Sequence, residues 1–172
     1  KNLSSAVLTG ANLQNANLFG ANLVGAQLAG ADLTGASLTG ANALDINLLN
    51  AILVDVAAGN AVLNSGDLTG ADLTDAQVKN TDMAGANLTG ATLNGTDLQG
   101  TDLEGANLAN TALSTAELKD VHAIALDACP DALPDGWQCI NACLVGPAAD
   151  LSSAGLSGAD LSGLDLKEAI FT

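Results

Sequence analysis

An apolar residue recurs at every fifth position of this chain, from Leu3 to Leu118, without a slip of register. We call these 24 positions the centres of the repeats. Twenty of them are Leu, and the other four are also apolar: Ala43, Ala58, Val78 and Met83. A period of five fits neither the α-helix, which repeats every 3.6 residues, nor the β-strand, which repeats every two. The spacing therefore predicts a repeat architecture.

The residues around each centre predict a turn in every repeat. Two residues after the centre stands Gly, Asn, Asp, Ser or Thr in all 24 repeats, and Gly in 12 of them. These residue types favour turns, through positive φ angles or through side-chain hydrogen bonds to the nearby backbone. Two residues before the centre Ala dominates, with Thr in four later repeats. We expect these small side chains to point inward beside the leucines.

Residues 21–25 read Ala-Asn-Leu-Val-Gly, and residues 31–35 read Ala-Asp-Leu-Thr-Gly. These units resemble the pentapeptide-repeat family, whose pattern is A(D/N)LXX, over residues 1–120 without a break and again from about Ala149. The resemblance implies an all-β fold, a right-handed quadrilateral parallel β-helix with four repeats per coil. Residues 20 apart would then stack in adjacent coils, so that leucines fill the interior in columns such as Leu48, Leu68 and Leu88.

The repeat pattern divides the chain into three segments. We expect about six coils over residues 1–120, a non-repeat insertion or cap over residues 121–148, and about one further coil over residues 149–172. In one arrangement the last coil stacks directly on coil six and the insertion protrudes. In the other, the insertion caps the rod and the last coil docks elsewhere.

The insertion has its own sequence signals. Residues 134–136 read Pro-Asp-Gly and predict a turn, and residues 137–145 predict an extended piece. We expect Trp137 to cover an apolar spot beside the solenoid. Residues 133–147 also resemble an interruption that recurs among cyanobacterial pentapeptide-repeat proteins, which indicates a cyanobacterial source.

All three cysteines lie in the insertion. Three cysteines allow three single disulfides, and we favour Cys129–Cys139, because a bridge that closes a small loop pins an irregular segment. Cys143 would lie on the same side as Cys139 if that segment is one strand. The alternative is three reduced thiols in a cytoplasmic protein. A zinc site is disfavoured, since His122 is the only histidine and no paired CxxC spacing occurs.

Composition excludes several classes of function. The chain has 19 acidic residues against four Lys and no Arg, so we predict no direct binding of nucleic acid. No apolar run approaches the roughly 18 residues of a membrane span. A rod filled with leucine offers no interior site, so we expect no enzyme, no catalytic residue, no cofactor and no metal site. His122 is interpreted as a surface or junction residue.

The acidic residues are unevenly distributed. Residues 1–60 hold three of them and residues 61–120 hold nine. Some members of the resembled family mimic DNA and bind type II topoisomerases, so a cytoplasmic DNA mimic is an alternative function. The acids scatter over all four sides, however, which favours a solvated acidic surface. An acidic cation-binding module is a third hypothesis, although no EF-hand spacing is present.

Coil three places Leu44, Leu49, Ile52 and Val54 at outward positions, flanked by Phe19, Val24 and Val62, and we call these seven residues the apolar belt. Such exposure indicates a surface for an unidentified protein partner or for a homodimer. Alternatively, the insertion folds back over the belt, or residues 43–58 form a short amphipathic helix. The helix is disfavoured because the five-residue phase continues on both sides.

The preferred interpretation is therefore a non-enzymatic structural or protein-interaction scaffold. A Cys129–Cys139 bridge would place it in an oxidising compartment, the periplasm or the thylakoid lumen. The cytoplasm is the alternative location.

Overall fold

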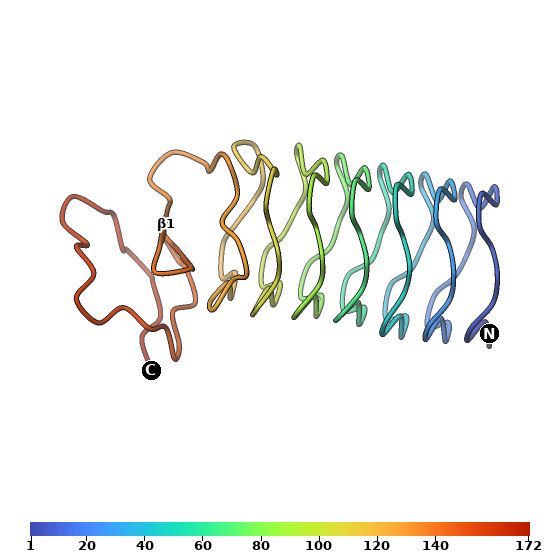
Figure 1. The fold of residues 1–172 in the computed structure, drawn as a ribbon, viewed down its shortest axis with the longest axis horizontal. Helices are drawn as coiled ribbons and strands as arrows, with labels where there is room; N and C mark the ends of the chain where they lie inside the picture. The colour runs from blue at the N-terminus through green and yellow to red at the C-terminus, as the bar shows by residue number, and fades with distance from the viewer.

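The computed structural model describes all 172 residues, and residues 1–120 form six coils of 20 residues stacked along one axis (Figure 1). Coil one is residues 1–20 and coil six is residues 101–120. Parallel bridges join residues 20 apart without interruption, from the Asn2–Asn22 pair to the Asp102–His122 pair. The fold is the all-β right-handed quadrilateral parallel β-helix that the resemblance implies. The structure contains no helix that is long and apolar enough to cross a membrane.

Each coil has four sides, one for each repeat, and we number the sides in chain order. Side one comprises residues 1–5, 21–25, 41–45, 61–65, 81–85 and 101–105. The two residues after each centre form a turn, which is the corner leading to the next side. The residue just before the centre lies in the middle of its side and carries the bridge to the next coil.

Backbone hydrogen bonds account for this geometry. The N–H of Leu28, a centre, donates to the carbonyl of Asn47 in the next coil at 2.7 Å, and the N–H of Asn47 donates back to Ala26 at 3.0 Å. The N–H of Ala31 closes the corner by donating to the carbonyl of Leu28 at 2.9 Å. Each side thus contributes a short parallel ladder of hydrogen bonds between adjacent coils, and each corner forms a backbone hydrogen bond of its own.

The corner residue two positions after the centre requires a left-handed backbone. Its φ is 64° at Gly30, 55° at Asp45 and 56° at Ser65. Gly adopts this conformation without strain, and Asn or Asp adopts it more readily than other residues. Thr115 is the one corner residue of the repeats up to residue 120 that lacks a positive φ, since branching at Cβ opposes it. Its Oγ1 instead accepts a hydrogen bond from the N–H of Gly95 at 3.0 Å.

The interior is a single apolar column in which leucine centres and small residues are buried. Coil three departs from the pattern, because Ala43 and Ala58 are small centres while Ile46 and Val56 occupy inward positions that usually hold Ala. Gly66 makes room for Ile46, since a Cβ at residue 66 would lie 3.2 Å from Ile46 Cγ2. Because large and small side chains exchange positions in coil three, the interior of this coil stays largely filled.

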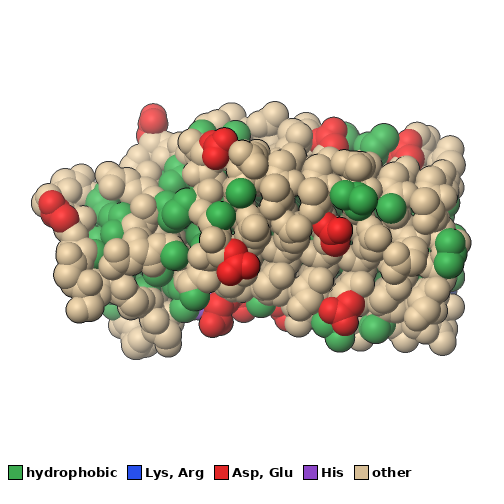
Figure 2. Space-filling model, in the orientation of Figure 1, with side chains coloured by type: hydrophobic (Ala, Val, Ile, Leu, Met, Phe, Trp, Pro, Cys, Tyr) green, Lys and Arg blue, Asp and Glu red, His purple; other side chains and the backbone are tan.

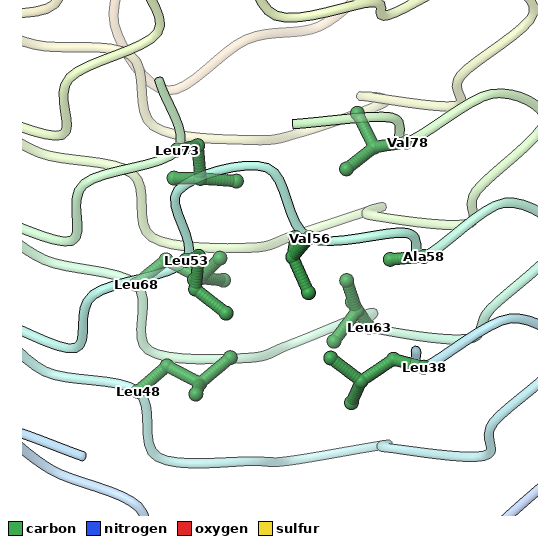
Figure 3. Close-up of a pocket in the computed structure, with 9 residues that line it drawn as sticks. All are labelled: Leu38, Leu48, Leu53, Val56, Ala58, Leu63, Leu68, Leu73 and Val78. Atoms are coloured by element: carbon green, nitrogen blue, oxygen red, sulfur yellow. The ribbon is translucent and has the colours of Figure 1, made fainter. Parts of the chain in front are cut away.

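The exchange leaves one apolar gap in the interior between coils two and four (Figure 3). Small side chains at Ala58 and Val78, which are stacked centres on side four, leave space that Leu would fill. The gap is lined only by apolar residues: Leu38, Leu48, Leu53, Val56, Ala58, Leu63, Leu68, Leu73 and Val78. An apolar gap of this kind costs packing energy because its lining atoms lose contacts.

The backbone ladder continues past residue 120, where the leucine pattern stops. His122 donates its N–H to Thr101 and accepts from Leu103 through its carbonyl at 2.7 Å. The chain then has one residue more than the period of 20, because Asn107 is bridged to Ala128, 21 positions on. Val121 and Ala123 are buried like any repeat residues. Coil six is therefore covered by the first part of the insertion.

The rest of the insertion forms a hairpin rather than the single extended piece expected over residues 137–145. Strands β1 (Gln138–Ile140) and β2 (Cys143–Val145) pair antiparallel, with Cys139 opposite Leu144. The chain reverses because Asn141 and Ala142 both take positive φ angles, 48° and 58°. Cys139 and Cys143 are thus on opposite strands of the hairpin, so the single strand that would have placed them on the same side does not form.

The last residues dock on the insertion and not directly on coil six. Asp150 is bridged to His122 and, 20 residues on, to Ile170. A small apolar cluster joins this coil to the hairpin: Ile124, Cys143, Val145, Ala149 and Leu151. Trp137 packs partly buried against both this cluster and the main core, with its ring over Gly146. Trp137 thus covers an apolar spot beside the solenoid, as the sequence predicts.

Candidate functional site

The apolar belt lies on the outside of coils one to four, and its members are spread round the rod. Four belong to side one or to its two corners: Phe19, Val24, Leu44 and Val62. The other three lie further round, on the corner after side two and on side three with its second corner: Leu49, Ile52 and Val54. The structure thus brings four belt residues to one side and separates the remaining three from them.

Side one carries the most exposed large member of the belt. Phe19 is 65% exposed at the corner that leads into side one. Val24 and Leu44 occupy the same corner of adjacent coils, where the N–H of Gly25 donates to the carbonyl of Leu44 at 2.9 Å. Val62 lies in the middle of the side, bridged to Asn42. These four residues lie on coils one to four, with the exposed side chains of Asn22 and Asn42 between the two corners.

Side three offers a weaker apolar surface. Ile52 is 41% exposed and is bridged to Asp32 on one coil and to Asp72 on the next. Val54 lies at the same corner position as Thr34 and Thr74, whose hydroxyls donate to those two carboxylates at 2.7 and 2.6 Å. Ile52 and Val54 therefore lie between polar side chains of the two adjacent coils.

Neither alternative explanation of the belt agrees with the structure. Residues 43–58 keep the regular alternation of bridge and corner and form no helix. The insertion lies beyond coil six, at the far end of the rod from the belt (Figure 1). The belt is therefore left uncovered by the rest of the chain.

Sequence reasoning missed one exposed residue of the same kind. Val7 is 78% exposed in the middle of side two in coil one. Val7 stands just before the centre Leu8, as Ile52 and Val62 stand just before their centres. Its exposure could therefore have been predicted from the sequence by the same rule.

Most repeat aspartates are engaged in their own corners. The carboxylate of Asp67 accepts hydrogen bonds from the Thr69 N–H at 3.1 Å and the Thr69 hydroxyl at 2.6 Å. Asp32 does the same with Thr34, and these bonds, with one from the Gln14 amide, hold the pKa of Asp32 below 3.8. Figure 2 shows acidic side chains spread singly along one face. Such aspartates stabilise the turns that they start.

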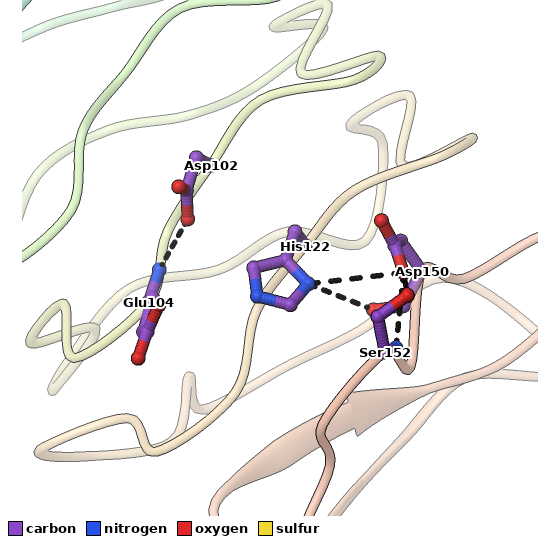
Figure 4. A network of polar contacts seen from close by, with 5 residues as sticks. All are labelled: Asp102, Glu104, His122, Asp150 and Ser152. Carbon is purple, nitrogen blue, oxygen red and sulfur yellow. Dashed lines mark hydrogen bonds and ion pairs between the residues drawn. The ribbon is translucent and has the colours of Figure 1, made fainter. Parts of the chain in front are cut away.

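His122 lies among acidic side chains on the continuation of side one (Figure 4). Asp102 is bridged to it from coil six, and Glu104 is the corner residue next to Asp102. One side-chain ligand atom from each of these three residues lies within 4.8 Å of the others. His122 Nδ1 lies 3.3 Å from the carbonyl oxygen of Asp150 and 3.9 Å from its carboxylate. His122 is thus a junction residue, as expected, but it joins a cluster that the sequence did not predict.

The carboxylate of Asp150 is fixed in place by Ser152. It accepts hydrogen bonds from the Ser152 hydroxyl at 2.5 Å and the Ser152 N–H at 3.0 Å. The hydroxyl bond is the main reason that the pKa of Asp150 lies below 3.8; partial desolvation opposes the shift, and the backbone bond and the charge of His122 assist it. His122 and Asp150 are 28 positions apart, and residues 123–148 between them belong to the insertion, so spacing in the sequence gives no sign of their contact.

The predicted disulfide is present. Cys129 and Cys139 are bonded, with 6.1 Å between their Cα atoms, and the bridge ties the strand β1 to the segment that covers coil six. Cys143 is a free cysteine buried in the small apolar cluster of the last coil.

The pentapeptide-repeat family model matches this chain in eight copies, over residues 2–35, 31–70, 51–90, 81–120 and 148–172. The matched ranges leave out most of the insertion. No curated protein sequence matched the chain.

Three solved structures illustrate the similarity. The pentapeptide repeat protein Rfr23 from the cyanobacterium Cyanothece 51142 is 26% identical, with a TM-score of 0.39 over 63% of this chain and 64% of that one. Full-length QnrB1, a plasmid-mediated fluoroquinolone resistance protein, is 16% identical, with a TM-score of 0.45 over 96% and 91%. A pentapeptide repeat protein from the Arabidopsis thaliana thylakoid lumen is 26% identical, with a TM-score of 0.25 over 59% and 63%. The chain thus spans less than two thirds of the first and third of these proteins.

Proposed function

Because this chain belongs to the pentapeptide-repeat family, we propose that it is a non-enzymatic scaffold that binds another protein through side one of its first four coils. The observation that carries this proposal is the group of outward apolar residues Phe19, Val24, Leu44 and Val62, of which Phe19 is the most exposed and which no other segment covers. An apolar surface that no part of the chain covers is typical of a protein-binding site. The partner is either a different protein or a second copy of this chain.

The rigidity of the rod supports this role. Every coil from two to six has buried centres and backbone bonds to both neighbours, so side one presents its side chains at fixed spacings. A surface that is ordered before binding loses little entropy when the partner docks. The large aromatic side chain of Phe19 can act as an anchor that fills a pocket on the partner.

Site-directed photo-crosslinking in the native cell tests the proposal. A photoreactive phenylalanine analogue replaces Phe19 in one variant and Leu44 in another. Matched controls carry it at Gln14, which is exposed in the same coil as Phe19, and at Thr92, which is exposed in the middle of side three. We expect one discrete protein adduct at positions 19 and 44 and none at the controls. Equal adducts at all four positions, or none at any, would reject the proposal.

A DNA-mimicking regulator of a type II topoisomerase is the second candidate. The nine acidic residues of coils four to six favour it. Their spread over all four sides and their use in corner hydrogen bonds argue against it. A DNA-supercoiling assay separates the two proposals. The scaffold leaves the topoisomerase uninhibited, whereas a mimic inhibits it and loses inhibition when Asp82 and Asp102 are replaced by Asn.

The Cys129–Cys139 bridge supports export to an oxidising compartment, the periplasm or the thylakoid lumen of a cyanobacterial cell. Thiols are counted by mass spectrometry on protein from its native cell, alkylated in denaturant because Cys143 is buried. One alkylated cysteine before reduction and three after it is the expected result. Three before reduction would place the protein in the cytoplasm.

A further inference from the structure

The far end of side one carries a cluster that a protein-binding scaffold does not need. Asp102 and Glu104 belong to coil six, and His122 lies on the next layer, directly bridged to Asp102. Two backbone hydrogen bonds hold these two layers together, Leu103 N–H to His122 at 2.7 Å and His122 N–H to Thr101 at 3.0 Å. A third, Asp150 N–H to Val121 at 3.0 Å, joins the last coil to the layer of His122. The three side chains are therefore positioned by a rigid backbone.

The ring of His122 is oriented by Asp150. Its Nδ1 faces the carbonyl oxygen of Asp150 at 3.3 Å and the carboxylate at 3.9 Å. Figure 4 shows the other ring nitrogen, Nε2, on the side of Asp102 and Glu104. A histidine that binds a metal characteristically donates its second ring N–H to a carboxylate or a backbone carbonyl, which fixes its tautomer and orientation. His122 has that arrangement before any ion is bound.

The donor atoms indicate which ion fits. One imidazole nitrogen and two carboxylate oxygens suit a divalent first-row transition ion such as Zn²⁺, whose ligand atoms lie about 2.0–2.2 Å from the metal. Calcium prefers six to eight oxygen ligands, and this cluster does not supply them. The ligand atoms already lie within 4.8 Å of one another, and Glu104 is exposed, so rotation of its side chain can shorten the remaining distances. Its exposure also leaves a coordination position open to solvent.

We propose that Asp102, Glu104 and His122 bind a divalent transition-metal ion of the Zn²⁺ type, with Asp150 as the positioning residue for His122. The two carboxylates offset the charge of the ion. The site connects coil six to the layer on which the last coil docks, so the bound ion stabilises the C-terminal end of the rod. This inference is independent of protein binding on coils one to four.

Calorimetric titration of the oxidised, metal-free chain of 172 residues with zinc chloride at neutral pH tests the proposal. We expect saturation at one ion per chain. Since His122 is the only histidine, its ring nitrogens give unique nuclear magnetic resonance signals, and the Nε2 signal should shift on binding. His122→Gln and Glu104→Gln should each weaken binding by at least about tenfold, because loss of even an outer-shell partner costs roughly 10–100-fold.

The matched control is Glu117→Gln, which removes the same charge from side four of coil six. It should bind zinc like the natural chain, and Glu104→Gln without metal should melt at the same temperature as the natural chain. The inference is overturned by absence of saturable binding, by an Nε2 signal that does not move, or by equal affinity in the three variants. The last result would mean that zinc binds to the acidic surface in general.

Discussion

Four threonines occupy interior positions where other coils have alanine, and their hydroxyls are satisfied inside the rod. The hydroxyls of Thr81, Thr96 and Thr101 donate to carbonyls 23 residues earlier, at 2.8 to 2.9 Å, and that of Thr111 donates to Leu108 at 2.7 Å. A buried hydroxyl without a partner would be costly. The inward position of these residues follows from the sequence, but the acceptors become visible only in the packed coils.

The corner hydrogen bonds of aspartate predict a measurable titration. Replacing Thr34 by Val removes the hydroxyl that is the largest cause of the low pKa of Asp32. The pKa should rise toward 3.8 in a carbon-detected NMR titration. The control is Thr39→Val, whose hydroxyl donates to a backbone carbonyl and not to a carboxylate. An unchanged pKa in Thr34→Val would show that the hydroxyl does not stabilise the charge.

The same bond links stability to pH. The pKa of Asp32 is lower in the folded chain than in the unfolded one, so its contribution is complete above the unfolded value. That contribution is lost as the pH falls through the folded pKa. We expect urea denaturation of Thr34→Val to show a shallower loss of stability below about pH 4 than the natural chain. A steeper loss would contradict this assignment.

At the scale of the element, coil three shows that the repeat tolerates exchange of large and small residues at the cost of a gap. Val78 lines that gap as a centre with less volume than Leu. Val78→Leu should fill it and raise the free energy of unfolding by about 0.5–1.5 kcal/mol, the range for one buried methylene. Urea denaturation with an unchanged m-value would establish this.

A matched variant adds volume where there is no gap. Ala41 is buried in coil three but does not line the gap, so Ala41→Val should lower stability by roughly 1–3 kcal/mol through overpacking. Equal destabilisation by Val78→Leu would mean that the interior is closed at both places.

The Cys129–Cys139 disulfide should stabilise only the insertion that contains it. Replacing Cys129 and Cys139 by Ser should cost the insertion about 2–3 kcal/mol, because the bridge closes a short loop. Hydrogen exchange should become faster over residues 126–148 and stay unchanged over residues 1–100, since each coil contacts only its neighbours. Cys143→Ala, which leaves the bridge intact, is the control. Faster exchange along the whole rod would refute this view of independent elements.

The repeat register was predictable from the sequence, and the junction was not. The register follows from a local rule, in which each centre and each corner residue requires the same environment in every coil. Beyond Leu118 that rule ends. The positions of His122 and Ala128 depend on backbone pairing with coil six, and the position of Asp150 depends on pairing with His122. The hairpin turns at Asn141 and Ala142, and an alanine with a positive φ is not a recognisable turn signal. The candidate metal cluster is therefore hidden from sequence reasoning, whereas most of the apolar belt is not.

At the scale of the whole molecule, side one changes character along the rod. Over coils one to four it carries the apolar residues Val24, Leu44 and Val62 among polar ones such as Asn22 and Asn42, and from Asp82 onward it is acidic, with His122 and Asp150 at its end. The proposed protein-binding surface and the proposed metal site thus lie on one side at opposite ends. Both assignments depend on the same claim, that one register of five places every side chain from Leu3 to Leu118.

Two neighbouring lysine substitutions test that claim most directly. Leu68 is buried between stacked leucines, while Thr69 is the corner residue beside it, with its hydroxyl bonded to Asp67. Leu68→Lys should lower the free energy of unfolding by roughly 3 kcal/mol or more, because it removes packing and buries a charge. Thr69→Lys should cost no more than about 1 kcal/mol, the value of one lost hydrogen bond. Urea denaturation followed by circular dichroism measures both, and equal losses from the two substitutions would contradict the register and everything placed by it.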